Sequence, residues 1–411
     1  MNNNVLAVME DFDWMDMMEK MQDFRLFSSL HVKGKRKGAA SSQEMDVLSR
    51  IMLSAVPLTP FALSVQMGLS KSAVSRLIES LERNRFLLNI AFCTMFIALY
   101  SIVFGTENSV AGLAVLLSIM VFRCADLGIR ASHGVFDILI VFGILAAGPK
   151  LSNLLPTGWA FCTNFIFILL LVILGCHNVI MYNHSTLVLA YLLLQGYDVG
   201  GVAYSKRLAG LFVGAVITAA VFYHNHRKQE YKRTFKSLFQ EFNLSSARTK
   251  WQLRLALTIS SAMLIGSLLD IPKPMWIGIA AMSVCVPFRN DMDYRAKYRA
   301  PGNTLGSVIF LVAYLLLPEG SISYMGILGG IGTGLSASYG WQAVFNAFSS
   351  LATATPVFGL STAILLRIFN NIFGSAYSWL FERVFEPVLS ALTDILGFIS
   401  SKLQKNINAM G

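Results

Sequence analysis

The sequence predicts an all-α membrane protein with two repeats of six helices, and three observations lead to this fold class. The chain of 411 residues is 55% hydrophobic and only 14% charged, with a mean hydropathy of +0.58. A soluble chain of this length needs more charged residues to cover its surface. The apolar residues gather in about a dozen segments, and two sets of these segments share short motifs.

The N-terminal part is polar and nearly neutral, with eleven Lys and Arg against ten Asp and Glu in residues 1–85. It begins with the acidic, Met-rich stretch Met1–Phe24, which has neither a basic start nor an apolar run. We therefore predict no signal peptide and a cytosolic N-terminus. A helical or linker segment is expected at 1–40, and a helix-turn-helix-like segment at 41–85.

The spacing of residues 58–81 predicts two short helices with a turn at Gly68 and a cap at Ser70. The exposed face of the second helix, suited to phosphates and base edges, carries Lys71, Ser72, Ser75 and Arg76. Residues 44–83 resemble the helix-turn-helix of the MarR-type regulators, which implies DNA as a partner. That family continues into a β-wing where this chain turns apolar after Arg85. A membrane-tethered regulator, a protein-contact module and a fusion remnant stay open.

Twelve apolar segments follow, six on each side of a polar linker. The first set is Phe86–Phe104, Ser109–Phe122, Ser132–Ala147, Gly158–Leu174, Asn178–Leu194 and Leu208–Tyr223. The second set is Gln252–Leu269, Met275–Pro287, Asn303–Leu317, Ser321–Ser336, Trp341–Thr353 and Ile368–Phe385. Several are shorter than the ~20 residues of a straight span, so ten to twelve spans are predicted.

These segments divide the rest of the chain into four parts. Transmembrane repeat 1 is expected at 86–223, a basic cytoplasmic linker at 224–250, and repeat 2 at 251–386. An amphipathic tail at 387–411 is predicted to lie along the inner membrane face or to pack on the transporter.

The distribution of positive charge predicts the orientation. With the N-terminus inside, the cytoplasmic segments 123–130, 224–254 and 289–299 hold fourteen Lys and Arg, and the external loops hold five. Cytoplasmic loops carry an excess of these residues. The sequence thus predicts a multi-pass inner-membrane protein with both termini in the cytoplasm and the bilayer as its first partner.

Short motifs recur in the two halves. At an offset of 166, the matching pairs are Gly112/Gly278, Ala114/Ala280, Phe122/Phe288 and Arg123/Arg289. An Arg-x6-Gly pattern begins at Arg207 and again at Arg367, an offset of 160. Six spans per half keep both copies in the same orientation, and repeats of this kind commonly place a binding site at their interface.

One motif of the second half resembles a known family. Trp276-Ile-Gly-Ile-Ala, Pro287-Phe-Arg and Arg299-Ala-Pro-Gly-Asn-Thr-Leu-Gly306 are similar to a motif of the fusaric-acid-resistance and aromatic-acid-exporter family, and the resemblance covers about residues 86–386. Gly302-Asn-Thr304 stands where Gly-Thr is usual, and the first copy keeps only Arg130 and Gly134. The resemblance implies proton-driven efflux of aromatic carboxylates, a small organic anion as partner, and leaves a homo-oligomer open.

Ionisable groups within spans are the candidate transport residues, because they are costly there. Asp137 is a candidate proton carrier, with Asn303 at the matching position of the second repeat; the alternative is that Asp137 pairs with Arg130. Arg207 and Arg367 could hold a carboxylate, or could simply reach the outer interface. Arg130 and Arg299 complete the translocation candidates.

Several further polar residues are interpreted as structural. Arg123 with Asp126 and Arg289 with Asp291 are expected to form ion pairs in cytoplasmic loops. Four asparagines are interpreted as bridges between helices: Asn89, Asn164, Asn346 and Asn370.

The sequence carries no motif of an enzyme or a metal site. The chain has no GxxxxGK[ST], HExxH or GxSxG pattern, and its five cysteines show no CxxC spacing. We therefore expect no enzyme activity, no cofactor and no metal.

Overall fold

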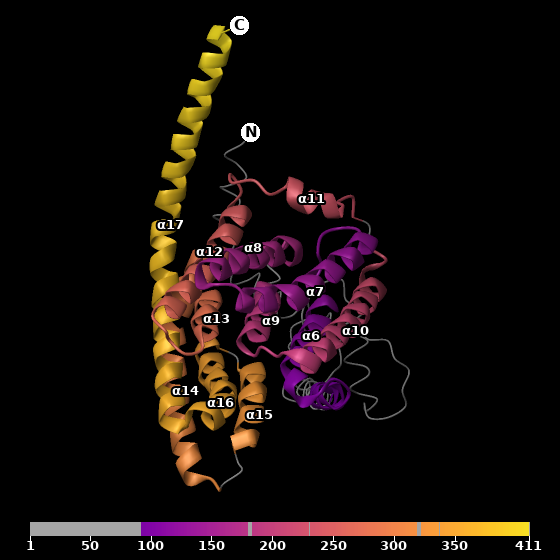
Figure 1. Ribbon diagram of the computed structural model, residues 1–411, viewed down its shortest axis with the longest axis vertical. Coiled ribbons are helices and arrows are strands. Elements are labelled where there is room, and N and C mark those ends of the chain that lie inside the picture. Colours follow the sequence, from indigo (N-terminus) through magenta and orange to yellow (C-terminus); the bar gives the residue numbers. More distant parts are fainter. Residues whose placement is uncertain (1–91, 180–182, 230, 319–321, 337, 411) are drawn as a thin grey trace, which may run out of the picture. The chain divides into compact units, whose positions relative to one another are not determined.

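The computed structural model describes residues 92–179, 183–229, 231–318, 322–336 and 338–410, and over these ranges the chain is helical, without a strand (Figure 1). The compact unit described below is Phe96–Gly411. Three helices are long and apolar enough to cross a membrane, by length and composition, and shorter apolar helices accompany them. The predicted fold class, an all-α polytopic membrane protein, is confirmed.

The helices follow the predicted order. In the first half they are Phe92–Phe104, α6 (Ser109–Phe122), α7 (Ala131–Leu154), α8 (Thr157–Gly175), α9 (His184–Gly196) and α10 (Gly201–His226), with the 3₁₀ turn η1 (Thr106–Asn108) before α6. In the second half they are α12 (Ala247–Leu268), α13 (Pro274–Val284), α14 (Arg289–Leu316), α15 (Ile322–Leu335), α16 (Tyr339–Phe358) and α17 (Leu360–Met410). The short helix α11 (Phe235–Gln240) lies in the linker.

The repeated glycines hold equivalent packing contacts in the two halves. Gly112 and Gly278 each let the second helix of their half approach the first, and Gly214 and Gly374 let the sixth helix approach the second. A Cβ on these four glycines would lie 2.7, 2.8, 2.5 and 2.8 Å from Tyr100, Met263, Val115 and Ala280, in that order. Such close approach of helices needs small residues. The motif repeat is therefore also a repeat of helix packing.

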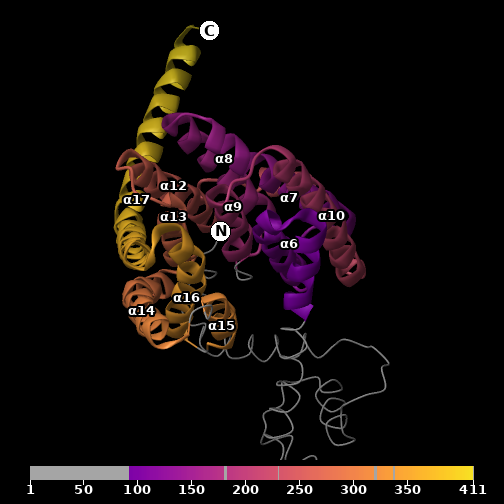
Figure 2. The same cartoon turned by 60° about the horizontal axis from the view of Figure 1, so that its bottom comes forward.

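The two halves meet through their middle helices. Helix α8 packs against α12, and α9 packs against α13. In Figures 1 and 2, α6, α7 and α10 stand on one side of this contact, and α14, α15 and α16 stand on the other. The contact between the halves is thus built from helices of both.

Helices α14 and α17 differ most from the predicted segments. Helix α14 begins at Arg289, so the charged stretch before Asn303 is helical and not a loop. Asp291 lies in its first turn, where a carboxylate is favoured by the helix dipole. Helix α17 has 51 residues, about 77 Å at the α-helical rise, and contains Pro387. The predicted tail continues α17 without a break, and Figures 1 and 2 show this end extending beyond the other helices.

Candidate functional site: two buried arginines in the second half

Two arginines from neighbouring helices come together inside the second half. Helix α14 packs against α17, which brings Arg299 and Arg367 close enough for their charges to interact. Arg299 is 5% exposed and Arg367 is 1% exposed. Asn371 joins them: its side-chain oxygen accepts from Nε of Arg299 at 3.2 Å, and its amide nitrogen donates to the carbonyl of Arg367 at 2.9 Å.

Each guanidinium retains a nitrogen without a hydrogen-bond partner in the described part of the chain. Arg299 Nη1 donates to the hydroxyl of Tyr339 at 3.4 Å, and Arg299 Nη2 has no acceptor. Arg367 Nη2 donates to the side-chain oxygen of Asn346 at 2.5 Å, and Arg367 Nε has no acceptor. The ring of Trp276 lies 5.3 Å from the Arg367 guanidinium carbon, a cation–π contact.

No carboxylate among the described residues forms an ion pair with either arginine. A buried charge without a counter-charge is unfavourable, and two of the same sign are more so. Guanidinium groups also match the geometry of a carboxylate better than an ammonium does. We call Arg299 and Arg367 the arginine pair: two buried guanidinium groups without a carboxylate partner among the described residues.

Asparagines of α14, α16 and α17 make further polar contacts in the second half. Asn303 is fully buried; its nitrogen donates to the carbonyl of Ala343 at 3.1 Å, and its oxygen has no partner among the described residues. Asn370 donates to the carbonyl of Pro272 at 3.1 Å. Asn346 thus bridges α16 and α17 as predicted, whereas Asn370 ties α17 to the α12–α13 loop. The role of Asn371 was missed, although its position four residues after Arg367 in the repeated motif is a signal that points to it.

Arg207, which occupies the position equivalent to Arg367 in the repeated Arg-x6-Gly pattern, has a different environment. It is 3% exposed, and its nitrogens donate to Asn108 Oδ1 at 3.0 Å and to the carbonyls of Leu194, Tyr197 and Glu107 at 3.4, 2.8 and 3.5 Å. Asn108 in turn donates to the carbonyls of Phe104 and Ala203. Arg207 therefore ties the start of α10 to two loops, and its donors are occupied by the protein.

Asp137 lies in α7, on the other side of the helix interface from the arginine pair. Its exposed fraction is 0%, and neither carboxylate oxygen has a hydrogen-bond partner among the described residues. Arg130 is exposed at the N-cap of α7, so the alternative reading of an Asp137–Arg130 pair is wrong. The reason is that the Asp137 side chain is buried between the helices, two helical turns along α7 from Arg130, whereas the Arg130 side chain is exposed.

The predicted loop pair of Arg123 and Asp126 does not form. Arg123 is exposed, and Asp126 accepts hydrogen bonds from the hydroxyl of Tyr231 and, at 2.7 Å, from the backbone nitrogen of Gly128. The linker therefore supplies the partner that the loop itself was expected to supply. Arg289 is exposed at the first position of α14.

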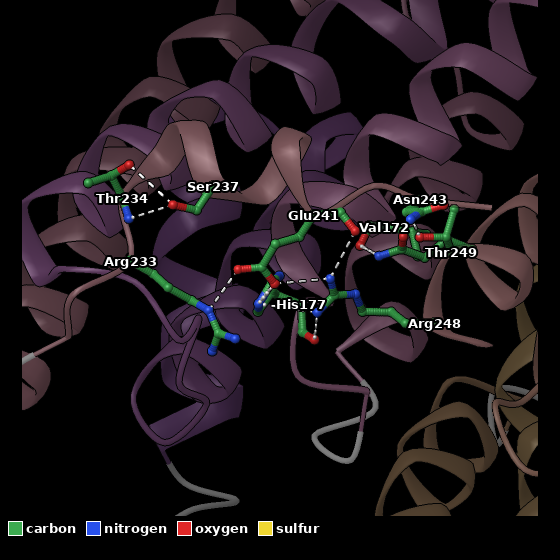
Figure 3. Close-up of polar contacts among 10 residues, drawn as sticks. Val172, His177, Arg233, Thr234, Ser237, Glu241, Asn243, Arg248 and Thr249 are labelled. Carbon is green, nitrogen blue, oxygen red and sulfur yellow. Dashed lines mark hydrogen bonds and ion pairs between the residues drawn. The ribbon is translucent and has the colours of Figure 1, made fainter. Parts of the chain in front are cut away.

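A charged cluster that the sequence did not predict fixes the linker to the first half (Figure 3). Glu241, after α11, accepts hydrogen bonds from Arg233 at 2.8 Å and from Arg248 at 3.2 Å. Burial alone would raise the pKa of Glu241, but these hydrogen bonds outweigh it and lower the pKa. Arg248 also lies 3.2 Å from Nε2 of His177, in the α8–α9 loop.

His177 is neutral in this cluster. Burial and the neighbouring Arg248 lower its pKa to about 4, against an ordinary value near 6.5. Nε2 therefore accepts from Arg248, and its 3.3 Å approach to Glu241 is not an ion pair at neutral pH.

We expect acid to destabilise the protein through His177. Between pH 6.5 and about 4 the unfolded chain binds a proton at this residue and the folded chain does not, so stability falls as the pH falls, by up to about 1.4 kcal/mol per pH unit. Thermal unfolding in detergent between pH 7.5 and 4.5 measures this. The His177→Asn variant should lose stability less steeply than the wild type; equal slopes would contradict the assignment.

A cavity of about 340 Å³ lies where the two halves meet, lined by α7, α8 and α9 of the first half and by α12 and α13 of the second. A binding site at the repeat interface stays a prediction. Among the described residues no group of His, Cys, Asp and Glu could hold a metal ion. The DNA-binding candidates Lys71, Ser72, Ser75 and Arg76 lie outside the described residues, as does Asn89.

The fold and the site define a class, a polytopic helical membrane protein with a buried cationic site in its second half. Residues 261–381 match the family model described as fusaric acid resistance protein-like, a segment that contains Trp276, Arg299 and Arg367. The match supports the resemblance noted in the motifs of that half. No curated protein and no solved structure matched the chain.

Proposed function

We propose that this protein is a membrane transporter that exports small organic anions, aromatic carboxylates foremost, with the proton gradient as its driving force. The arginine pair carries the proposal: Arg299 and Arg367 are buried and lack a carboxylate partner among the described residues. A substrate carboxylate would neutralise this charge and accept from the free nitrogens. The family match over 261–381 supports the same class of protein.

The aromatic preference rests on what surrounds the guanidiniums. Trp276 stacks on Arg367, and Tyr339 contacts Arg299. An aromatic carboxylate can place its charge on the arginine pair and its ring against these side chains, because aromatic groups pack favourably with one another. We further propose the inner membrane as the location, with both termini in the cytoplasm, on the excess of Lys and Arg in the linker and short loops.

Asp137 is the proposed carrier of the coupling proton. Removal from water disfavours a charged carboxylate, so a buried Asp without a counter-charge holds a proton more readily than an exposed one. Its counterpart in the second repeat is Asn303, which cannot ionise. The two halves would therefore divide the work, with proton transfer in the first and anion binding in the second.

Transport into proteoliposomes of the full chain tests both parts of the proposal. With radiolabelled benzoate we expect accumulation driven by a pH gradient, and exchange of benzoate across the membrane without a gradient. Asp137→Asn should lose the gradient-driven accumulation and keep the exchange, since the amide carries no proton. Asp270→Asn is the matched control: Asp270 is exposed and has a φ of 51°, which Asn tolerates.

Two results would overturn the proposal. Gradient-driven accumulation by Asp137→Asn at the wild-type rate would exclude Asp137 as the proton carrier. A wild-type protein that moves neither benzoate nor any other organic anion of a broad panel would refute the transport function itself.

A further inference from the structure

The cavity between the halves is separate from the arginine pair. Neither Arg299 nor Arg367 lines it. Its walls come from the end of α7, the start of α8, the end of α9, the last turns of α12 and the start of α13. A volume of about 340 Å³ lies at the lower end of the range for small-molecule sites.

Three polar side chains in this cavity have unused hydrogen-bonding groups. Ser260 is fully buried, and its hydroxyl has no hydrogen-bond partner in the part of the chain that the structure describes. Asn164 is 4% exposed; its oxygen accepts from Tyr191 at 2.9 Å, and its amide nitrogen has no partner among the described residues. Gln195 donates to Ser152, and its side-chain oxygen is buried without a partner in the described ranges. Unused buried polar groups are unfavourable unless a ligand or water satisfies them.

A cation lies at the rim. Lys273, in the α12–α13 loop, donates to the carbonyl of Gly196 at 3.1 Å, and its ammonium lies 4.8 Å from the ring centre of Tyr197. Burial lowers the pKa of Lys273. Its present acceptor is a neutral carbonyl, and an anion would make a stronger, charge-assisted hydrogen bond with the same ammonium.

The polar groups and the cation stand at different depths. Asn164 lies seven residues inside α8, and Ser260 lies eight residues before the end of α12, which places both about 10–12 Å along their helices from the end that carries Lys273. Phe161, Met263 and Leu264 form apolar wall between them. The cavity thus offers a positive rim, an apolar middle and a hydrogen-bonding floor.

We propose that this cavity is a second binding site for a small aromatic carboxylate. The ligand carries a hydroxyl group on its ring, para or meta to the carboxylate. Lys273 binds the carboxylate, and Ser260 and Asn164 bind the hydroxyl. The proposal rests on the proposed function for its place in transport, since the ligand is of the transported class. The proposal adds that the cavity between the halves selects for the hydroxyl group. The carboxylate is recognised by a cation at both sites, Lys273 here and the arginine pair in the second half.

Isothermal titration of the purified full chain in micelles, with 3-hydroxybenzoate and benzoate as probes, tests the second site. To isolate the cavity, the titrations are repeated in the Arg299→Gln/Arg367→Gln double variant. In that background we expect 3-hydroxybenzoate to bind about 3- to 10-fold more tightly than benzoate, the worth of one or two hydrogen bonds. Ser260→Ala should reduce this preference to less than about 2-fold.

Charge recognition is tested in the same background. Lys273→Gln should weaken both probes about 10-fold, as expected for a charge-assisted bond. The matched controls are Lys206→Gln, an exposed lysine in α10, and Ser118→Ala, whose hydroxyl bonds within α6 at 2.8 Å. Neither control should change the affinity for either probe.

The outcomes separate this proposal from the proposed function. If the double variant binds neither probe, or if Ser260→Ala and Lys273→Gln bind both probes like their background, the cavity is not a site, and transport by the arginine pair is unaffected. If the double variant transports benzoate normally while the cavity variants lose binding, the cavity stands and the role of the arginine pair falls.

Discussion

Replacement of Arg367 or Arg299 by Gln is expected to lower the rate of benzoate transport at limiting concentration by at least about 30-fold, without loss of folded protein. Loss of one partner from a buried charged contact costs about 2–5 kcal/mol of binding. The fold should tolerate the change, because each substitution removes one of two like charges that lie together in the core. Gln can still donate to Asn346 or Asn371.

Arg207→Gln provides the contrast for this prediction. Arg207 satisfies an asparagine oxygen and three backbone carbonyls, so its loss leaves buried acceptors unpaired and should lower the unfolding temperature in detergent. Arg289→Gln, at an exposed arginine of α14, is the control for loss of a positive charge and should leave both transport and stability unchanged.

Lysine variants sharpen the same experiment. Arg367→Lys and Arg299→Lys keep the charge but lose the planar fork, so they should transport benzoate at an intermediate rate. The anion-binding role of the arginine pair would be contradicted if Gln variants transported benzoate as well as the wild type, or if they failed only because the protein no longer folded.

The second large effect is expected at a buried ion pair between α12 and α17. Arg254 and Glu382 are 6% and 8% exposed and form an ion pair, and Arg254 Nη2 also donates to the carbonyl of Val286 at 3.1 Å. Glu382→Ala leaves a buried guanidinium without its counter-charge. A change of this kind costs about 3–5 kcal/mol of unfolding free energy.

A double variant separates the cost of leaving one buried charge unpaired from the contribution of the ion pair itself to the free energy of unfolding. Arg254→Met/Glu382→Leu removes both charges and keeps the volume filled, so it should be about as stable as the wild type. The measurement is unfolding of the full chain in mixed micelles, read as a double-mutant cycle. Lys150→Met in the exposed Lys150–Asp198 pair is the control and should change stability by less than about 1 kcal/mol. A double variant as unstable as Glu382→Ala would refute this account.

Much of the fold follows from local sequence. Each predicted apolar segment from Ser109 to Phe385 corresponds to a helix, because an apolar run of this length can satisfy its backbone in lipid only as a helix. The equivalence of Gly112 and Gly278 follows from their fixed offset in the sequence, and both lie where two helices approach closely. The division of the chain into a helix-turn-helix segment, repeats, linker and tail stays a prediction.

The hydrogen-bond partners of the buried side chains do not follow from the local sequence. Arg207 and Arg367 share a motif, yet the first donates to four protein oxygens, and the second, beside Arg299, retains a nitrogen without an acceptor among the described residues. The motif describes the surroundings of each arginine along its own helix. Whether its guanidinium meets a loop carbonyl or another arginine depends on the neighbouring helices.

The sequence by itself therefore determined the helical class and the order of the helices, because these depend on residues within a few turns of one another. Only the tertiary structure decided that Arg299 and Arg367 share Asn371, that Asp137 has no described partner, and that a cavity with Lys273 at its rim lies between α8 and α12. The physical reason is that these groups lie 68 or more residues apart in the chain. They meet only through the way in which each helix is rotated about its axis and crosses its neighbours, and no local sequence pattern encodes that rotation or crossing angle.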